Sequence, residues 1–274
     1  MIKIIDVDKL FERHVKAYVK DKIGKIKPEQ IESQIANMYK DFGKTPLEEL
    51  GGKSPEEYYL SFSAETLADA LVEHIESGVE VPDYLCDALL EKDCVNVLLA
   101  KLEQDPNEEV AMYLMNIINS KGVEPCLDRY IEIVAWDYPQ SMKELATEGL
   151  CEFAERVKQK LYDNWSEYSL EAKEYFAQVL SNVGEDEKAL SILIEMFALH
   201  PEEVSVYASY LAKLGSDKAL PVLYTAIEKE DISYADFEEL RFAIESLGGS
   251  YDIIRDFSKD PTYKLIKGIK PEDK

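Results

Sequence analysis

The sequence predicts an all-α protein, built as an α-α superhelix of antiparallel helix pairs with an N-terminal helical cap. Apolar residues recur at helical spacing along nearly the whole chain, and no alternating strand pattern bounded by hairpin turns is convincing. Helical segments that end at glycine also repeat with a period near 31 residues. The chain has 274 residues, 46% of them hydrophobic, which is enough to bury a sizeable core.

The first 42 residues predict two helices. One covers residues 8–23 and ends at Gly24. The other begins near Pro28 and runs to residue 42, since proline suits the first helical position, where its missing N–H would have had no partner.

The next segment, residues 43–54, contains two Gly-Lys-Thr/Ser runs that resemble a phosphate-binding loop. Such a loop needs a further glycine five positions earlier, and Met38 and Leu47 occupy those positions. Helix capping explains the same residues better, with an N-cap, a first-position proline and a capping-box acid in each run. The two sets are Thr45, Pro46 and Glu48, then Ser54, Pro55 and Glu57. Gly51 is predicted to end the short helix between them.

From residue 64 onward the pattern predicts helices of about 12 to 18 residues with very short breaks, many of them in antiparallel pairs. They are expected at residues 82–91, 93–103, 107–121, 124–136, 139–163, 170–183, 187–200, 201–214, 217–230 and 234–247.

Internal repetition is clearest around the glycines. Gly184 and Gly215 are 31 residues apart, and Gly248 follows 33 residues later. Gly122 lies 62 residues before Gly184, which is twice 31. The period therefore predicts a glycine turn near residue 153, where the pattern instead predicts one long helix through Phe153, so this unit is expected to be irregular or to carry an insertion.

Each copy predicts a helix that ends at glycine, a tight turn, and a second helix that begins with Ala-Leu, as at Ala189 and Ala219. Such a hairpin cannot cover its own apolar faces, but stacked hairpins can. These residues resemble the HEAT-like repeat superfamily, in particular its short-period, phycobilin-lyase-type members, over roughly residues 64–257. Tetratricopeptide and other α-solenoids share the feature, although a tetratricopeptide period would be 34. The expected domains are an N-terminal helical segment (1–60), a HEAT-like solenoid (61–263) and a charged C-terminal tail (264–274).

The charge pattern excludes some partners. The formal net charge is −24, which is the wrong sign for a protein that neutralises nucleic-acid phosphates. Residues 1–27 carry +4 and residues 264–274 carry +2, so the middle carries −30. The basic first helix is expected to dock against this acidic body, or alternatively to form a small anion-contacting surface. No membrane-spanning or secretory segment is predicted, and the four cysteines lack disulfide or metal spacing, so we expect reduced thiols and a cytoplasmic protein.

Candidate chemistry is sparse. His14, His74 and His200 belong to no metal or catalytic motif, and His200 is expected at a helix end. The acidic runs 185–187 and 228–231 lack a calcium-loop pattern and are interpreted as solvated helix termini. We therefore predict no catalytic, cofactor-binding or metal-ligating residues.

Tyrosine is abundant, with 17 copies, and combines large contact area with a polar tip. The tyrosines of most interest are Tyr58, Tyr59, Tyr207, Tyr210 and Tyr224. Tyr207 aligns with the predicted core positions Phe176 and Leu240, whereas Tyr224 is expected to be the more exposed.

These patterns predict a non-catalytic scaffold or adaptor with an acidic concave surface that binds a protein partner with a basic surface. An enzyme is the alternative, because the HEAT-like resemblance includes phycobilin lyases and DNA-repair glycosylases. A regulatory module that presents residues 1–60 is a third possibility, and the oligomeric state stays open.

Overall fold

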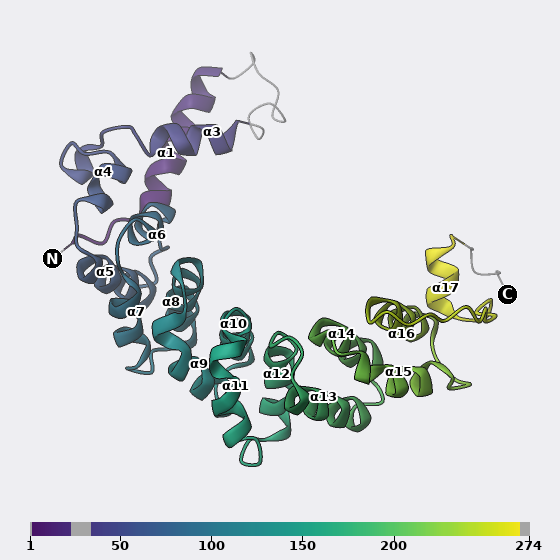
Figure 1. Ribbon diagram of the computed structural model, residues 1–274. Coiled ribbons are helices and arrows are strands. Elements are labelled where there is room, and N and C mark those ends of the chain that lie inside the picture. The colour runs from purple at the N-terminus through teal and green to yellow at the C-terminus, as the bar shows by residue number, and fades with distance from the viewer. Residues whose placement is uncertain (1, 23–33, 269–274) are drawn as a thin grey trace. The chain divides into compact units, whose positions relative to one another are not determined.

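Helices provide the regular structure of the chain. The computed structural model describes residues 2–22 and 34–268, and within them no β-strand occurs beyond one isolated bridge between Leu47 and Lys53 (Figure 1). The all-α prediction is confirmed. The predicted start of the second helix near Pro28 lies outside the described residues. Packing divides the chain into two compact units, residues 1–129 and 130–274, and the predicted limits at residues 60 and 263 stay predictions.

Unit 1 contains a series of short helices. They are α1 (Val7–Lys22), α3 (Ile35–Phe42), η1 (Glu48–Leu50), α4 (Pro55–Leu60), α5 (Ala64–Glu76), α6 (Asp83–Leu90), α7 (Val95–Leu102), α8 (Glu108–Lys121) and η2 (Glu124–Cys126). Helix α6 packs between α4 and α8, and α5 packs on α6, α7 and α8. Helix α1 packs on α3 and forms an ion pair with η1, in which Arg13 Nη2 lies 3.1 Å from Glu49 Oε1.

Helix starts in this unit follow the capping signals in one of the two predicted cases. Ser54 caps α4: its hydroxyl accepts a hydrogen bond from Glu57 N at 3.3 Å, and the Glu57 carboxylate accepts one from Ser54 N at 3.1 Å. Gly51 ends η1 with a φ of 67°, as predicted. The predicted N-cap at Thr45 is wrong. Its hydroxyl instead donates back to Asp41 O at 3.0 Å, because the chain stays extended through the bridge at Leu47 and η1 begins only afterwards.

Unit 2 contains helices of about the same lengths as those of unit 1. Helix α9 (Leu127–Ala135) crosses from unit 1 into it. Its other helices are α10 (Gln140–Cys151), α11 (Ala154–Asp163), α12 (Leu170–Leu180), α13 (Glu187–Leu199), α14 (Val204–Leu214), η3 (Asp217–Ala219), α15 (Leu220–Ile227), α16 (Tyr234–Ser246) and α17 (Pro261–Ile266). Alternate helices form a row in which α10 packs on α12, α12 on α14 and α14 on α16 (Figure 1). The helices between them, α11, α13 and α15, pack against this row.

The repeat period also appears in the side-chain contacts of both units. Several polar contacts join residues that are 31 or 32 positions apart. They are Lys92 Nζ to Leu60 O (3.1 Å), Lys101 Nζ to Asp69 Oδ1 (2.6 Å), Lys121 Nζ to Leu90 O (2.8 Å), Ser205 Oγ to Asp236 Oδ1 (2.6 Å) and the ion pair of Lys218 with Glu187. Positions one period apart in the sequence are therefore neighbours in space.

The predicted continuous helix over residues 139–163 is wrong: a turn near residue 153 interrupts it, at the place the period indicates but without the predicted glycine. The chain breaks between α10 and α11 at Glu152 and Phe153, and Phe153 N donates to Leu150 O at 3.0 Å. Both residues keep negative φ angles, −67° and −117°, so the turn needs no glycine. At Gly215, by contrast, the turn uses a φ of 82°. The other predicted helices between residues 82 and 247 agree with the structure to within about three residues at each end.

Candidate functional site

The tyrosines of interest are less exposed than a contact surface requires. Tyr59 and Tyr207 lie fully inside the core, Tyr207 as predicted, and Tyr58 and Tyr210 are half-buried. Tyr224 is more exposed than Tyr207, as predicted. It is half-buried, and its hydroxyl is 3.1 Å from both the N and the O of Ser250, donating to the carbonyl and accepting from the amide. The 250–257 segment that follows α16 holds this side chain, which helical spacing could not show.

Carboxylates gather instead around α6 in unit 1. We call this group the α6 patch; it consists of Asp8, Glu56, Glu80, Asp83 and Asp87. Three of them, Glu80, Asp83 and Asp87, are exposed. Within the described part of the chain, no lysine or arginine forms an ion pair with any of the five. The patch is therefore a group of carboxylates without a neutralising cation.

Two carboxyl groups of the α6 patch, those of Asp8 and Asp87, have raised pKa values. Burial raises the pKa of Asp8, and the nearby carboxylates of Glu80 and Asp83 raise it further. Burial also raises the pKa of Asp87, with further contributions from Asp83 and Glu56. Both shifts mean that the folded protein holds these negative charges at a cost, which a positive charge placed beside them would remove.

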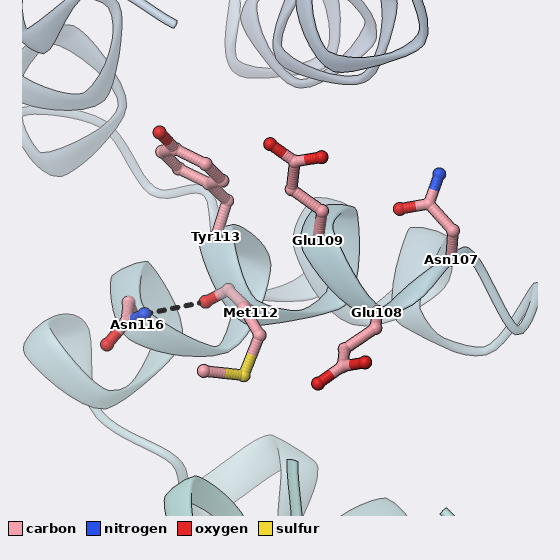
Figure 2. A pocket seen from close by; sticks show the side chains of 6 residues that line it. All are labelled: Asn107, Glu108, Glu109, Met112, Tyr113 and Asn116. Carbon is pink, nitrogen blue, oxygen red and sulfur yellow. Dashed lines mark hydrogen bonds between the residues drawn. The ribbon is translucent and has the colours of Figure 1, made fainter. Parts of the chain in front are cut away.

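Helix α8 lies beside this acidic surface and adds one aromatic side chain, Tyr113. A shallow hollow of about 630 Å³ lies on this helix. Its lining residues are Asn107, Glu108, Glu109, Met112, Tyr113 and Asn116. Figure 2 shows Glu109 and Tyr113 pointing to the same side of α8. Burial raises the pKa of Tyr113, and the nearby Glu109, Glu80 and Asp83 contribute, which places this ring close to the α6 patch. The Tyr113 ring therefore lies next to the carboxylates of the α6 patch.

Unit 2 has a second acidic group, on the row of alternate helices. We call it the α12–α14 patch; it consists of Glu144, Glu171, Glu174, Glu202 and Glu203. Burial raises the pKa of Glu174, and the neighbouring glutamates raise it further, whereas His200 lowers it. Tyr175 lies among Glu144, Glu171 and Glu174.

Two basic side chains lie inside the α12–α14 patch. Lys143 is buried, and its Nζ is 2.8 Å from Glu171 Oε1. His200, at the C-terminal end of α13 as predicted, is buried with Nδ1 3.3 Å from Glu202 and Nε2 3.6 Å from Glu174, and its ring stacks on Tyr207. The Lys143 ammonium thus neutralises part of the second patch, and the His200 ring lies among the same glutamates.

The remaining predicted candidates have structural positions. His14 is exposed on α1 with its ring near Phe42, whereas His74 is fully buried and burial lowers its pKa. The acidic run at residues 185–187 begins α13, where the Asp186 carboxylate accepts hydrogen bonds from Lys188 N and Ala189 N, both at 3.0 Å. The run at residues 228–231 follows the end of α15.

The four cysteines are free. Cys94 and Cys126 are buried, whereas Cys86 and Cys151 are half-buried. Burial raises the thiol pKa of all four, to about 12 for Cys86 and Cys126 and to about 11 for Cys151. These thiols stay protonated at neutral pH and are poor nucleophiles.

The described residues contain no group of three or more His, Cys, Asp and Glu side chains placed to hold a metal ion. Among them, no helix has the length and apolar character needed to cross a membrane. Both acidic patches escaped the sequence analysis, which located no site residues. The available signals were like charges at i, i+4 in Asp83 and Asp87, and at i, i+3 in Glu171 and Glu174.

No family model, curated protein or solved structure matches the chain. The resemblance to HEAT-like repeats therefore stays a prediction.

Proposed function

We propose that this chain is a non-catalytic helical-repeat scaffold that binds a basic segment of another protein through the α6 patch, with the α12–α14 patch as a separate, weaker site of the same kind. The α6 patch carries the proposal, because burial and neighbouring carboxylates raise the pKa of Asp8 and Asp87, and none of its five acids has a cationic partner among the described residues. A lysine- or arginine-bearing segment would relieve this repulsion, and electrostatic complementarity of this kind sets both specificity and association rate.

The proposal includes an α-solenoid of HEAT-like type. It is supported by the packing of α10, α12, α14 and α16 in one row and by the polar contacts at separations of 31 or 32 residues in both units. In such repeats stability comes mainly from nearest neighbours, and the exposed side chains of the stacked helices form an extended binding surface. The free, protonated thiols are those of a reducing compartment, so the proposal places the protein in the cytoplasm.

The test is binding of a fluorescent lysine-rich peptide, measured by anisotropy. The double variant Asp83→Asn/Asp87→Asn removes two charges from the α6 patch and should weaken binding about 3- to 30-fold, since an exposed charge pair contributes a few tenths to one kcal/mol. The control Glu76→Gln/Glu195→Gln removes two exposed charges from α5 and α13 and should change binding less than about 2-fold.

A matched peptide with glutamine in place of lysine should not bind, and binding of the lysine peptide should weaken as salt rises. Equal losses in the patch variant and the control would show that net charge alone attracts the peptide, and the assignment to the α6 patch would be wrong.

A further inference from the structure

Several large apolar side chains are exposed in the last part of unit 2. They are Phe242, Ile253, Ile254, Leu265 and Ile266. The exposed fraction reaches 96% for Ile254 and 81% for Leu265. Among the described residues they make up five of the eleven large hydrophobic side chains that are exposed, although they fall within a short stretch of the chain. Such a concentration marks an interaction surface.

The cause is an interrupted repeat. Helices α12 and α14 each have a neighbour of the same row on both sides, whereas α16 has α14 on one side and only the six-residue α17 as a further helix. In place of the next long helix, residues 250–257 run without helical structure, and we call them the strap. The Tyr251 hydroxyl donates to Glu228 at 2.7 Å, and Arg255 donates to Lys229 O, so the strap is tied to the end of α15. Ile253 and Ile254, between these anchors, are left exposed.

The strap, α16 and α17 enclose a hollow of about 480 Å³. Aromatic rings supply much of its lining, namely Tyr234, Phe237, Tyr251, Phe257 and Tyr263. Its charged lining residues are Arg241, Arg255 and Lys267 together with Glu238, Glu245 and Asp252. Three positive and three negative groups balance, which is unusual in a chain with a net charge of −24. The hollow is therefore locally neutral, and exposed Ile253 and Ile254 of the strap add apolar side chains to its lining.

We propose that two copies of this chain associate through this surface, end to end, about a two-fold axis. In a two-fold interface the same patch meets itself, so a surface with apolar side chains and equal numbers of opposite charges is complementary to its own copy. The charge balance selects a second copy. The lining of the hollow has no net negative charge that would attract a basic partner. Other surfaces of two such acidic chains would repel each other.

The proposal predicts an unusual salt dependence. Repulsion between two bodies of −24 opposes the dimer, and added salt screens it, so association should strengthen as salt rises. Binding of a basic partner to the α6 patch should respond in the opposite direction. The dimer and the proposed function can therefore fail independently.

The experiment is sedimentation velocity of the full chain over a range of protein and salt concentrations. Wild type should form a dimer, more tightly at higher salt. The variant Ile254→Asp/Leu265→Asp should lower the association constant at least about 100-fold, because a two-fold dimer would bury four of the altered side chains.

The matched control is Leu170→Asp/Leu199→Asp, which adds the same charge at two leucines exposed elsewhere in unit 2, on α12 and α13. It should change the association constant less than about 5-fold. A wild-type chain that stays monomeric at every concentration, a dimer that weakens with salt, or equal losses in both variants would each overturn the proposal. The wild-type salt series needs no variant to fold.

Discussion

The two units use the same packing rule but distribute charge differently. In both, alternate helices pack on one another and polar contacts join residues 31 or 32 apart. Unit 2 buries Lys143 and His200 among the glutamates of its α12–α14 patch, whereas the α6 patch of unit 1 has no cationic partner among the described residues. Two acidic surfaces of one chain therefore differ in net charge, because basic side chains lie within one of them and not within the other. The α6 patch should be the stronger site for a basic partner.

The turns differ in a similar way. Gly215 ends α14 with a φ of 82°, whereas the break between α10 and α11 uses negative φ at both of its residues. One turn depends on the conformational freedom of glycine and the other does not. Regular spacing of turns along the chain therefore does not require one residue type at each turn.

The largest expected effect tests whether the two units respond separately. Phe176 is fully buried in α12, and Phe176→Ala should lower the free energy of unfolding by about 3–5 kcal/mol. In a structure dominated by nearest-neighbour contacts, the loss of amide hydrogen-exchange protection should centre on α10, α12 and α14 and be small in α5 to α8. Equal loss of protection in both units would mean that they unfold as one.

A smaller effect separates the two kinds of turn. A Cβ at Gly215 would meet no atom within 4 Å, so the cost of Gly215→Ala is conformational, and we expect about 1–2 kcal/mol in denaturant unfolding. The control Glu152→Ala, at the glycine-free turn, should cost less than about 0.5 kcal/mol, since Glu152 is exposed. Similar costs at both positions would contradict the distinction.

The smallest expected effect concerns two carboxylates, Asp87 and Asp186, whose ionisation should change the free energy of unfolding in opposite directions. Burial and neighbouring acids raise the pKa of Asp87, so the folded state binds its proton more readily than the unfolded chain does. Asp87→Asn should stabilise the protein slightly at pH 7, by less than about 1 kcal/mol after solvent screening, and this gain should shrink as pH falls through the raised pKa.

Asp186 in unit 2 should behave in the opposite way. Its burial opposes ionisation, but hydrogen bonds from Ala189 N, Tyr162 and Lys158 outweigh burial and lower its pKa. Its ionised form therefore stabilises the fold at neutral pH, and that stability is lost as pH falls through the lowered pKa. Thermal melts of Asp87→Asn and Asp186→Asn between about pH 2 and pH 7 check both signs, because the Asp186 contribution is lost only below the unfolded pKa of about 4. A gain for Asp186→Asn at pH 7 would refute the contrast.

Much of the fold could be predicted because its signals are local. The capping box at Ser54 and the helix-ending glycine at Gly51 depend on contacts within a few residues, and both are confirmed. The failed predictions depended on competing contacts. Thr45 bonds back to Asp41 because the chain ahead of it is extended, and continuous apolar spacing concealed the break at Phe153.

The acidic patches could not be located in this way. Asp8 and Asp83 approach each other only because α3 joins their helices: α1 packs on α3, and Tyr84 of α6 donates to Tyr39 O of α3. No spacing along the chain records this. The hydrogen bond that holds the Tyr224 hydroxyl could not be predicted for the same reason, since its partner in the strap lies 26 residues further along the chain.

The sequence by itself determined the helical class, the approximate helix limits and the period near 31, because helical spacing, caps and glycine turns act over a few residues. Only the tertiary structure decided which carboxylates meet, which bases lie among them and which apolar side chains remain exposed at the end of unit 2. Those outcomes depend on contacts between distant segments, whose energies are set by burial and by charges brought together through packing.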